Sequence, residues 1–174
     1  ASVGETSLEV AGDGFSSLPI SITSAPQVLS FRWIDKYGLN GKVAFDLNIE
    51  PVADEAPSVI AQGLPSQTVI LDEEQINFEA LAADDFGVKK IGISWKSLDE
   101  EAENYIAGES LISSGGATNT PMQVAAIFSA AKVKITPQAI EVRLWVEDFK
   151  PDGGKIYGPP HSLFVLEADQ HAMW

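Results

Sequence analysis

The stretch Leu81–Trp95 reads LAADDFGVKKIGISW and places two acidic residues, a phenylalanine and a glycine between two apolar segments. After the glycine, Ile91, Ile93 and Trp95 alternate with polar or small residues, which is the period-two pattern of a strand with one buried face. An aspartate at a strand end can accept hydrogen bonds from backbone N–H groups two residues further on, and glycine tolerates positive φ. The letters DDFG therefore predict a turn between two strands.

The same alternation recurs along the chain, whereas helical periodicity is scarce. It covers 43–49, 76–82 and 142–146, and short apolar runs add strands at Leu18–Ile22, Val28–Ile34, Val124–Phe128 and Leu163–Leu166. Gly, Pro, Asn and Asp punctuate the gaps between these segments. Many short strands with such punctuation are typical of a sandwich or barrel, and we predict an all-β chain.

Two segments carry other signals. Leu98–Ile106, LDEEAENYI, has acidic residues early in the run and predicts a single turn or a short helix. Met122–Ala131, MQVAAIFSAA, is rich in alanine but is interpreted as a strand that leads into a turn. Between them, Gly108–Pro121, which contains SSGGATNTP, is expected to be an exposed polar loop.

The segment Pro51–Pro57, PVADEAP, separates two strand-rich stretches. Its prolines disfavour a continuing ladder and hold the preceding residues extended, so it predicts an interdomain linker. We expect a partial or small β domain over 1–54 and an immunoglobulin-like sandwich over 55–174, because about 100 residues suffice for seven strands. The first part is either the C-terminal half of a domain that begins upstream or a strand layer that leans on the second domain.

A weak internal repeat favours the first of these arrangements. Arg32–Pro51 resembles Leu144–Asp169, because each contains a Trp, acidic residues, an aromatic residue, a glycine-containing turn and a final apolar strand. Each is predicted to be the last hairpin of a sandwich. The pattern of acid, any residue and aromatic follows an apolar strand three times, beginning at Asp35, Asp84 and Glu147.

Composition limits the classes of function. The chain carries 25 acidic and 11 basic residues, and its net charge of −14 opposes binding to nucleic acid or anionic lipid. Its 174 residues include no cysteine, which excludes disulfides, thiolate zinc sites and thiol nucleophiles. No run of about 18 apolar residues occurs, so the chain is not expected to be membrane-inserted itself. It begins with Ala1 rather than methionine, and we expect a piece of a longer protein.

Three stretches together resemble a known class of repeats. They are the run 82–88, A-x-D-D-F-G-V, the lysine-rich strand that ends at Trp95, and ITPQ at 135–138 before EVRLWVEDFKPDGGKIYGPPHSLFVL. They are similar to tandem immunoglobulin-like or cadherin-like repeats in the exported part of large, membrane-anchored bacterial proteins of unknown function. The likeness covers about Ala25–Ala172 and implies an extracytoplasmic sandwich with no known activity. The linker VADEAP departs from the acidic calcium-binding linker of cadherins.

Oxygen ligands near the predicted domain ends raise a calcium alternative. The acidic residues concerned are Asp54, Glu55, Asp84, Asp85, Asp148 and Asp152. Calcium takes six to eight oxygen ligands, and no run in this chain has EF-hand or cadherin spacing. The turn remains the favoured interpretation, and no metal or other cofactor is predicted.

The four tryptophans differ in their predicted environments. Trp95 shares the apolar face of its strand and is predicted to be the central core aromatic. Trp145 lies opposite the apolar face of its strand, so it is expected on the outer surface or in an interface. Trp33 raises the same question, although apolar neighbours on its side make burial an alternative, and Trp174 ends the chain. Exposed aromatics can stack on sugar rings, which makes Trp33 and Trp145 the candidates for surface binding.

Signatures of catalysis are weak. His161 follows two prolines at the start of a strand, where exposure is expected, and His171 lies near the C-terminus. A zinc site would need further ligands from carboxylates. No Gly-x-Ser-x-Gly elbow, phosphate loop or dinucleotide glycine pattern accompanies them, so an enzyme is not predicted.

These patterns predict a non-enzymatic, extracytoplasmic spacer, adhesion or protein-binding module of a larger, membrane-anchored protein, in the periplasm or at the cell surface. The alternative is a carbohydrate-binding module that uses exposed Trp residues. The expected partners are other domains of the same protein, with another protein or a glycan as further candidates and nucleic acid excluded.

Overall fold

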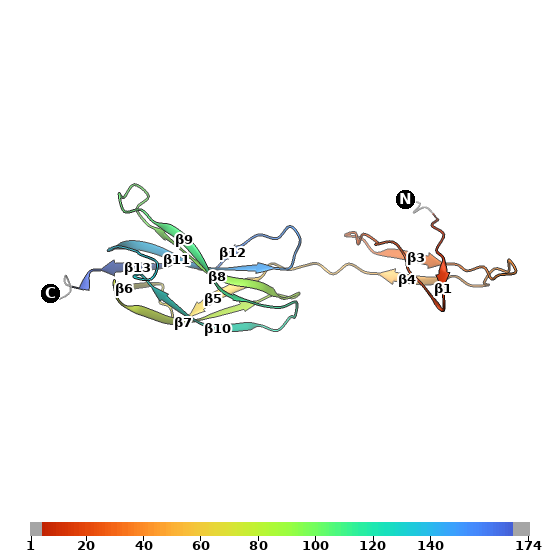
Figure 1. Cartoon of the computed structure of the whole chain (residues 1–174), viewed down its shortest axis with the longest axis horizontal. Coiled ribbons are helices and arrows are strands. Elements are labelled where there is room, and N and C mark those ends of the chain that lie inside the picture. Colours follow the sequence, from red (N-terminus) through yellow and green to blue (C-terminus); the bar gives the residue numbers. More distant parts are fainter. Residues whose placement is uncertain (1–4, 169–174) are drawn as a thin grey trace. The chain divides into compact units, whose positions relative to one another are not determined.

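The computed structural model describes residues 5–168, and the chain divides into two compact units, Ala1–Ala53 and Asp54–Trp174. Every element named among residues 5–167 is a strand, which confirms the predicted all-β chain (Figure 1). Within residues 5–168, no helix has the length and apolar character needed to cross a membrane. His171 and Trp174 lie outside the described residues.

The first unit contains two hairpins. Its strands are β1 (Val10–Ala11), β2 (Gly14–Phe15), β3 (Gln27–Phe31) and β4 (Phe45–Ile49), paired antiparallel as β1 with β2 and β3 with β4. The predicted strand at Leu18–Ile22 is wrong. Pro19 cannot donate to a ladder, and the run has no buried face that would select an extended strand. The strand predicted at Val28–Ile34 is shorter than expected, because Ile34 forms only an isolated bridge with Asn40.

The first unit leaves its apolar side chains open. No residue among 5–53 is fully buried. Phe31 lies between Phe15 and Phe45, with ring centroids 5.5 Å and 6.1 Å away, yet Val28, Phe45 and Leu47 stay exposed. Two short hairpins have too little surface to enclose a core.

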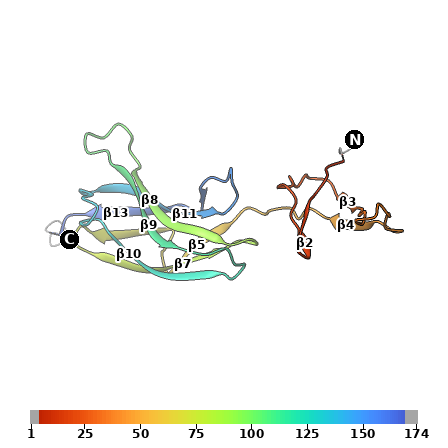
Figure 2. The same ribbon diagram turned by 45° about the vertical axis from the view of Figure 1, so that its right-hand side comes forward.

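The second unit consists of two sheets that face each other across one hydrophobic core (Figures 1 and 2). The smaller sheet has the order β10 (Met122–Ser129), β7 (Gln75–Ala83), β5 (Ser58–Gln62). The larger sheet has the order β6 (Gln67–Leu71), β13 (His161–Leu166), β11 (Gln138–Asp148), β8 (Val88–Ser97), β9 (Ala107–Ser114), with β12 (Ile156–Tyr157) added to β11. The second unit is therefore a β-sandwich, as the alternating sequence pattern predicted.

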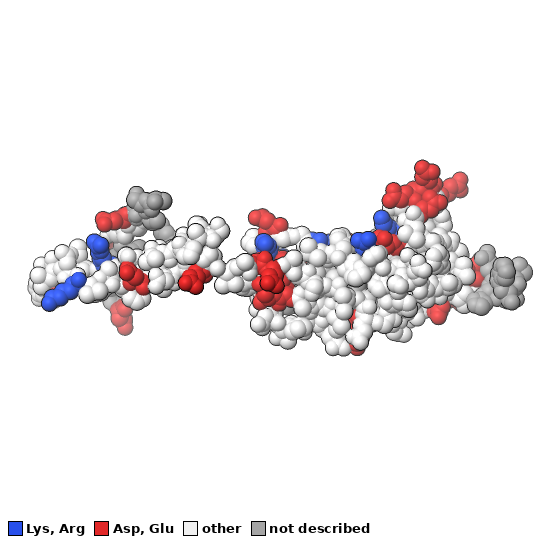
Figure 3. Space-filling view, turned by 180° about the vertical axis from the view of Figure 1, so that it is seen from behind, with Lys and Arg blue, Asp and Glu red and all other residues white. Residues whose placement is uncertain are grey.

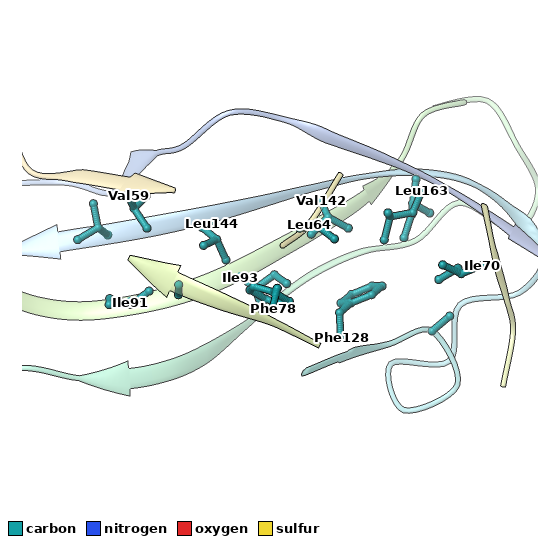
Figure 4. Packing of buried hydrophobic residues seen from close by; sticks show 14 of the residues in the cluster. Val59, Leu64, Ile70, Phe78, Ile91, Ile93, Phe128, Val142, Leu144 and Leu163 are labelled. Carbon is teal, nitrogen blue, oxygen red and sulfur yellow. The ribbon is translucent and has the colours of Figure 1, made fainter. Parts of the chain in front are cut away.

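The core of the second unit is built from the inward positions of the alternating strands. Figure 4 shows Phe78 and Phe128 of the smaller sheet opposite apolar side chains of the larger sheet, such as Ile93 and Leu144. The inward positions predicted from the sequence on β7, β8 and β11 are confirmed, because alternate residues there are buried or nearly so.

The chain enters and leaves the second unit at opposite ends. Ser58, the first residue of β5, pairs with Ala83 at the end of β7, and we call this end the N-terminal pole. The N–H of Asp72, just before β7 begins, donates to the carbonyl of Leu166 at 2.8 Å, and we call that end the C-terminal pole. β7 has nine residues and spans roughly 26 Å between the poles.

The connections on either side of β9 differ in part from the prediction. The segment Leu98–Ile106 forms turns and no helix, because Asp99 Oδ1 accepts the N–H of Glu101 at 3.0 Å and no apolar face holds a helix against the sheet. Figure 3 shows the acidic side chains of this loop gathered at its tip. Met122–Ala131 is a strand that leads into a turn, as predicted. The loop predicted over Gly108–Pro121 is wrong for Gly108–Ser114, because these residues belong to β9 and pair with β8.

Candidate functional site

The quoted DDFG segment is the corner that carries the chain from the smaller sheet to the larger one. Asp84 Oδ2 accepts the N–H of Phe86 at 3.1 Å, and Gly87 follows with φ of 114°. The predicted turn is thus confirmed, and its glycine is required because that φ strains any other residue. The Phe86 ring, expected to fold back onto the sandwich end, remains about half exposed.

The same aspartate turn occurs at two other places in the chain, at one of them a residue later than predicted. Asp35 Oδ1 accepts the N–H of Tyr37 at 2.8 Å, which matches the predicted pattern. At the third site the acceptor is Asp148 rather than Glu147, since Asp148 Oδ1 accepts the N–H of Lys150 at 3.0 Å. The predicted motif was therefore read one residue too early there.

Three carboxylates gather at the N-terminal pole. Asp54, Asp84 and Asp85 each place an oxygen within 4.8 Å of the others. Lys150 Nζ lies 4.0 Å from Asp54 Oδ2, and the backbone N–H of Glu55 donates to Asp85 Oδ2 at 3.4 Å. One oxygen each of Asp54 and Asp84 is buried without a hydrogen-bond partner. Figure 3 shows acidic side chains at this end of the unit.

This cluster accounts for half of the residues considered for calcium. The carboxylates of Glu55, Asp148 and Asp152 are not part of it. Three carboxylates can attract a cation, but calcium takes six to eight oxygens and the nearby ammonium of Lys150 already offsets part of the charge. The three aspartates form an acidic patch around the turn. The turn accounts for their position without a bound metal ion.

Trp145 points away from the core, as predicted, but the expected exposure is wrong, because only 4% of the residue is exposed. Its indole lies over Gly92, its cross-strand partner, where a Cβ would overlap the ring. Lys155 covers the other side, with Nζ 4.3 Å from the ring centroid, and forms an ion pair with Glu109 of β9. Trp145 therefore offers no free ring to a ligand.

Lys155 is held in place by Glu109. The pKa of the Lys155 amine is raised above its ordinary value, chiefly because it donates a hydrogen bond to Glu109. The pair reaches from the segment before β12 to the edge strand β9, across the indole of Trp145. We call this pair the strap.

The other two described tryptophans lie in different settings. Trp33 is 54% exposed, and its ring lies against Gly41, so it remains a candidate for surface binding in the first unit. Trp95 packs at the margin of the core, 6.2 Å from Phe128 between ring centroids, but stays partly exposed. The prediction that Trp95 lies at the centre of the core is thus only partly right.

The outer face of the larger sheet is hollowed next to Trp145. Its floor consists of outward positions that face one another in the strand register, with Ser94 opposite Arg143 and Lys96 opposite Glu141. The hollow has a volume of about 610 Å³, and Glu109 and Tyr157 also line it. Arg143 Nε lies 3.0 Å from Glu141 Oε1, but its N–H is not aligned with any acceptor.

Sequence reasoning missed this hollow. Trp95, which lines the hollow, was predicted as a core residue, and Trp145 was singled out without Glu141 and Arg143, which share its outward face in the run EVRLW. The alternation in this run does indicate which side chains point outward. The other residues of the hollow come from β9 and β12, and the pairing of these strands cannot be predicted from the sequence.

His161 also lies in an environment that differs from the predicted one. It is 8% exposed, and its Nδ1 lies 2.9 Å from the carbonyl oxygen of Pro65. The predicted exposure is wrong because His161 occupies an inward position of β13, which β6 flanks in parallel. The imidazole is a structural donor to a backbone carbonyl at this position.

The fold defines the class of the molecule as an all-β protein with a two-sheet sandwich. No family model matches the chain, and no curated protein matches it. A β-glucosidase from Listeria innocua in complex with gluconolactone shares 12% identity, covers 68% of this chain and 17% of that chain, and has a TM-score of 0.38.

A second solved structure concerns T cell specificity and activation by the bacterial superantigen toxic shock syndrome toxin-1. One of its chains shares 10% identity, covers 63% of this chain and 100% of that chain, and has a TM-score of 0.37. The present chain thus spans 17% of the β-glucosidase, and neither likeness bears on function.

Proposed function

We propose that the chain is a non-enzymatic spacer or adhesion segment of a larger extracytoplasmic protein that is anchored to a membrane. The observation that carries this proposal is the position of the chain ends in the second unit. Ser58 lies at the N-terminal pole and Leu166 at the C-terminal pole, so a unit of this kind adds its full length to a series. A module whose ends met at one pole would add little reach.

The finer architecture that we propose is immunoglobulin-like. Its support is the strand order, in which β5 joins the smaller sheet while the next strand, β6, joins the larger one in parallel with the last strand, β13. The remaining strands of the larger sheet, β11, β8 and β9, are antiparallel. Two sheets of antiparallel strands around one core are the general pattern of such sandwiches.

For the first unit, we propose the C-terminal half of a preceding domain in a tandem array. The hairpin of β3 and β4 resembles that of β11 and β13, and each is associated with an aspartate turn. Each hairpin also has a tryptophan that packs on a glycine: Trp33 lies against Gly41 of the same hairpin, and Trp145 lies over Gly92 of the neighbouring strand β8. The open apolar side chains of the first unit are consistent with a missing complementary layer.

The spacing role can be tested by a distance between spin labels. The chain has no cysteine, so Ala56→Cys with Glu167→Cys places two unique labels near the two poles, both at exposed positions. We expect a narrow distribution centred above roughly 26 Å, the length of β7. A matched pair at the N-terminal pole, Ala56→Cys with Asn119→Cys, should give a shorter distance. Equal distances, or a broad distribution for the first pair, would contradict the spacer.

A further inference from the structure

We propose that the hollow on the outer face of the larger sheet binds a neutral saccharide. This inference goes beyond the spacer role and uses different residues. The hollow has a volume of about 610 Å³, which lies in the range of small-molecule sites. Its side chains come from β8, β9, β11 and β12, so a rigid sheet rather than a mobile loop positions them.

The charges that line the hollow favour a ligand without net charge. Lys96 and Arg143 are basic, whereas Glu109 and Glu141 are acidic and pair with Lys155 and Arg143, so charges of both signs lie around the hollow in a chain whose net charge is −14. An anionic ligand would meet two carboxylates and a cationic ligand would meet two cations. A neutral molecule avoids both repulsions.

The hydrogen-bonding capacity of the hollow suits hydroxyl groups. The guanidinium of Arg143 only donates, and the carboxylate of Glu141 only accepts. The Nε atom of Arg143 is enclosed beside Glu141, but the Arg143 side chain is 38% exposed and that of Glu141 is 19% exposed, so both still line the hollow. A hydroxyl both donates and accepts, and a sugar with neighbouring hydroxyls can therefore bridge this pair.

Tyr157 supplies an aromatic surface at the wall of the hollow. It is 47% exposed, and its place on β12 opposite Trp145 fixes its backbone to the sheet. A partly exposed ring with one polar end can pack against the C–H face of a pyranose while its hydroxyl stays in water. Trp145 itself takes no part, because the strap covers it.

Binding can be measured by nuclear magnetic resonance on the full chain. The probes are maltotriose, cellotriose, xylotriose, mannotriose and chitotriose, each titrated to about 20 mM, and the signals are backbone amides with the indole N–H groups of the tryptophans. We expect at least one trisaccharide to shift the amides of Arg143 and Tyr157 saturably, with the Trp33 indole unchanged. The dissociation constant should be on the order of 1 mM.

Matched variants locate the site. Tyr157→Ala and Glu141→Gln should each weaken binding about tenfold, whereas Tyr37→Ala, which removes an exposed tyrosine of the first unit, should leave it unchanged. Unchanged amide signals of β7, in the opposite sheet, show that the fold of the free Tyr157→Ala variant is kept.

Three outcomes would overturn the saccharide site. The first is that none of the five sugars causes a saturable shift. The second is that the shifts persist in Tyr157→Ala or depend on Trp33. The third is that an extended peptide binds at the β9 edge and the sugars do not bind. The pole-to-pole distance is measured without sugar, so either proposal can fail while the other stands.

Discussion

Trp145 and Gly92 face each other across β11 and β8, and the indole occupies the space that a side chain at Gly92 would need. This pairing lets a large aromatic residue lie flat on the outer face of a sheet and become buried there. The absence of a side chain at one position thus determines the environment of the other.

Gly92→Ala should lower the free energy of unfolding by about 1–3 kcal/mol, because the added methyl group must displace the indole or the backbone. Urea unfolding followed by Trp fluorescence measures this change. Gly116→Ala is the matched control, since nothing lies within 4 Å of its Cβ, and its effect should stay below about 0.5 kcal/mol. Equal effects of the two substitutions would contradict the packing of Trp145 on Gly92.

Lys155→Met keeps an aliphatic chain over Trp145 and removes the strap. The pKa of Lys155 is higher in the folded state, because Glu109 accepts a hydrogen bond from its ammonium group. The stabilisation is therefore complete below the ordinary value of 10.5 and is lost as the pH rises through the higher folded value.

Unfolding curves at about pH 8 and about pH 11.5 test this dependence. The wild type should be the more stable protein at the lower pH, and the gap to Lys155→Met should narrow at the higher pH. Lys132→Met, at an exposed turn, should show no such pH dependence. A gap that widens with rising pH would contradict the strap.

Asp84 combines a turn with an acidic patch, and two substitutions separate these roles. Asp84→Asn keeps an oxygen that accepts the Phe86 N–H and removes one of three neighbouring charges, so the free energy of unfolding should rise by up to about 1 kcal/mol. Asp84→Ala loses the hydrogen bond and should cost about 1 kcal/mol. Thermal unfolding measures both.

The same experiment examines the calcium alternative. We expect the midpoint of the wild type to agree within about 1 °C in calcium chloride and in a chelator. A rise with calcium that Asp85→Asn abolishes would instead assign a ligand role to the patch.

His161 stabilises the backbone carbonyl of Pro65. His161→Leu fills much of the volume but removes the donor to the Pro65 carbonyl, so it should cost about 1 kcal/mol. His161→Gln retains an N–H donor and should cost less. Chemical unfolding of the two variants side by side provides the comparison, and equal losses would show that packing alone explains this position.

The sequence predicted the inward faces of β7, β8 and β11 correctly, because burial of one sheet face imposes an alternation that can be read residue by residue. The turn at Asp84 was also predictable, since its chemistry lies within four residues. Trp145 was assigned to the correct side but the wrong environment. Lys155 and Glu109, which bury its indole, come from parts of the chain that only the strand pairing brings together.

The remaining errors have related causes. His161 is buried because β6 joins the edge of β13, and the donor–acceptor contact with Pro65 links residues far apart in the chain. Asp54 meets Asp84 and Asp85 only because β5 pairs with the end of β7. Local patterns do not contain these long-range pairings, so the candidate sites were less predictable than the fold.

The parallel ladder between β6 and β13 has a mechanical consequence. A pulling force on the chain draws β6 toward the N-terminal pole and β13 toward the opposite one, along the direction of the strands. The five residue pairs from Gln67 and Ser162 to Leu71 and Leu166 are then loaded in shear and must yield together rather than unzip in turn. Tension would thus meet its main resistance at this ladder.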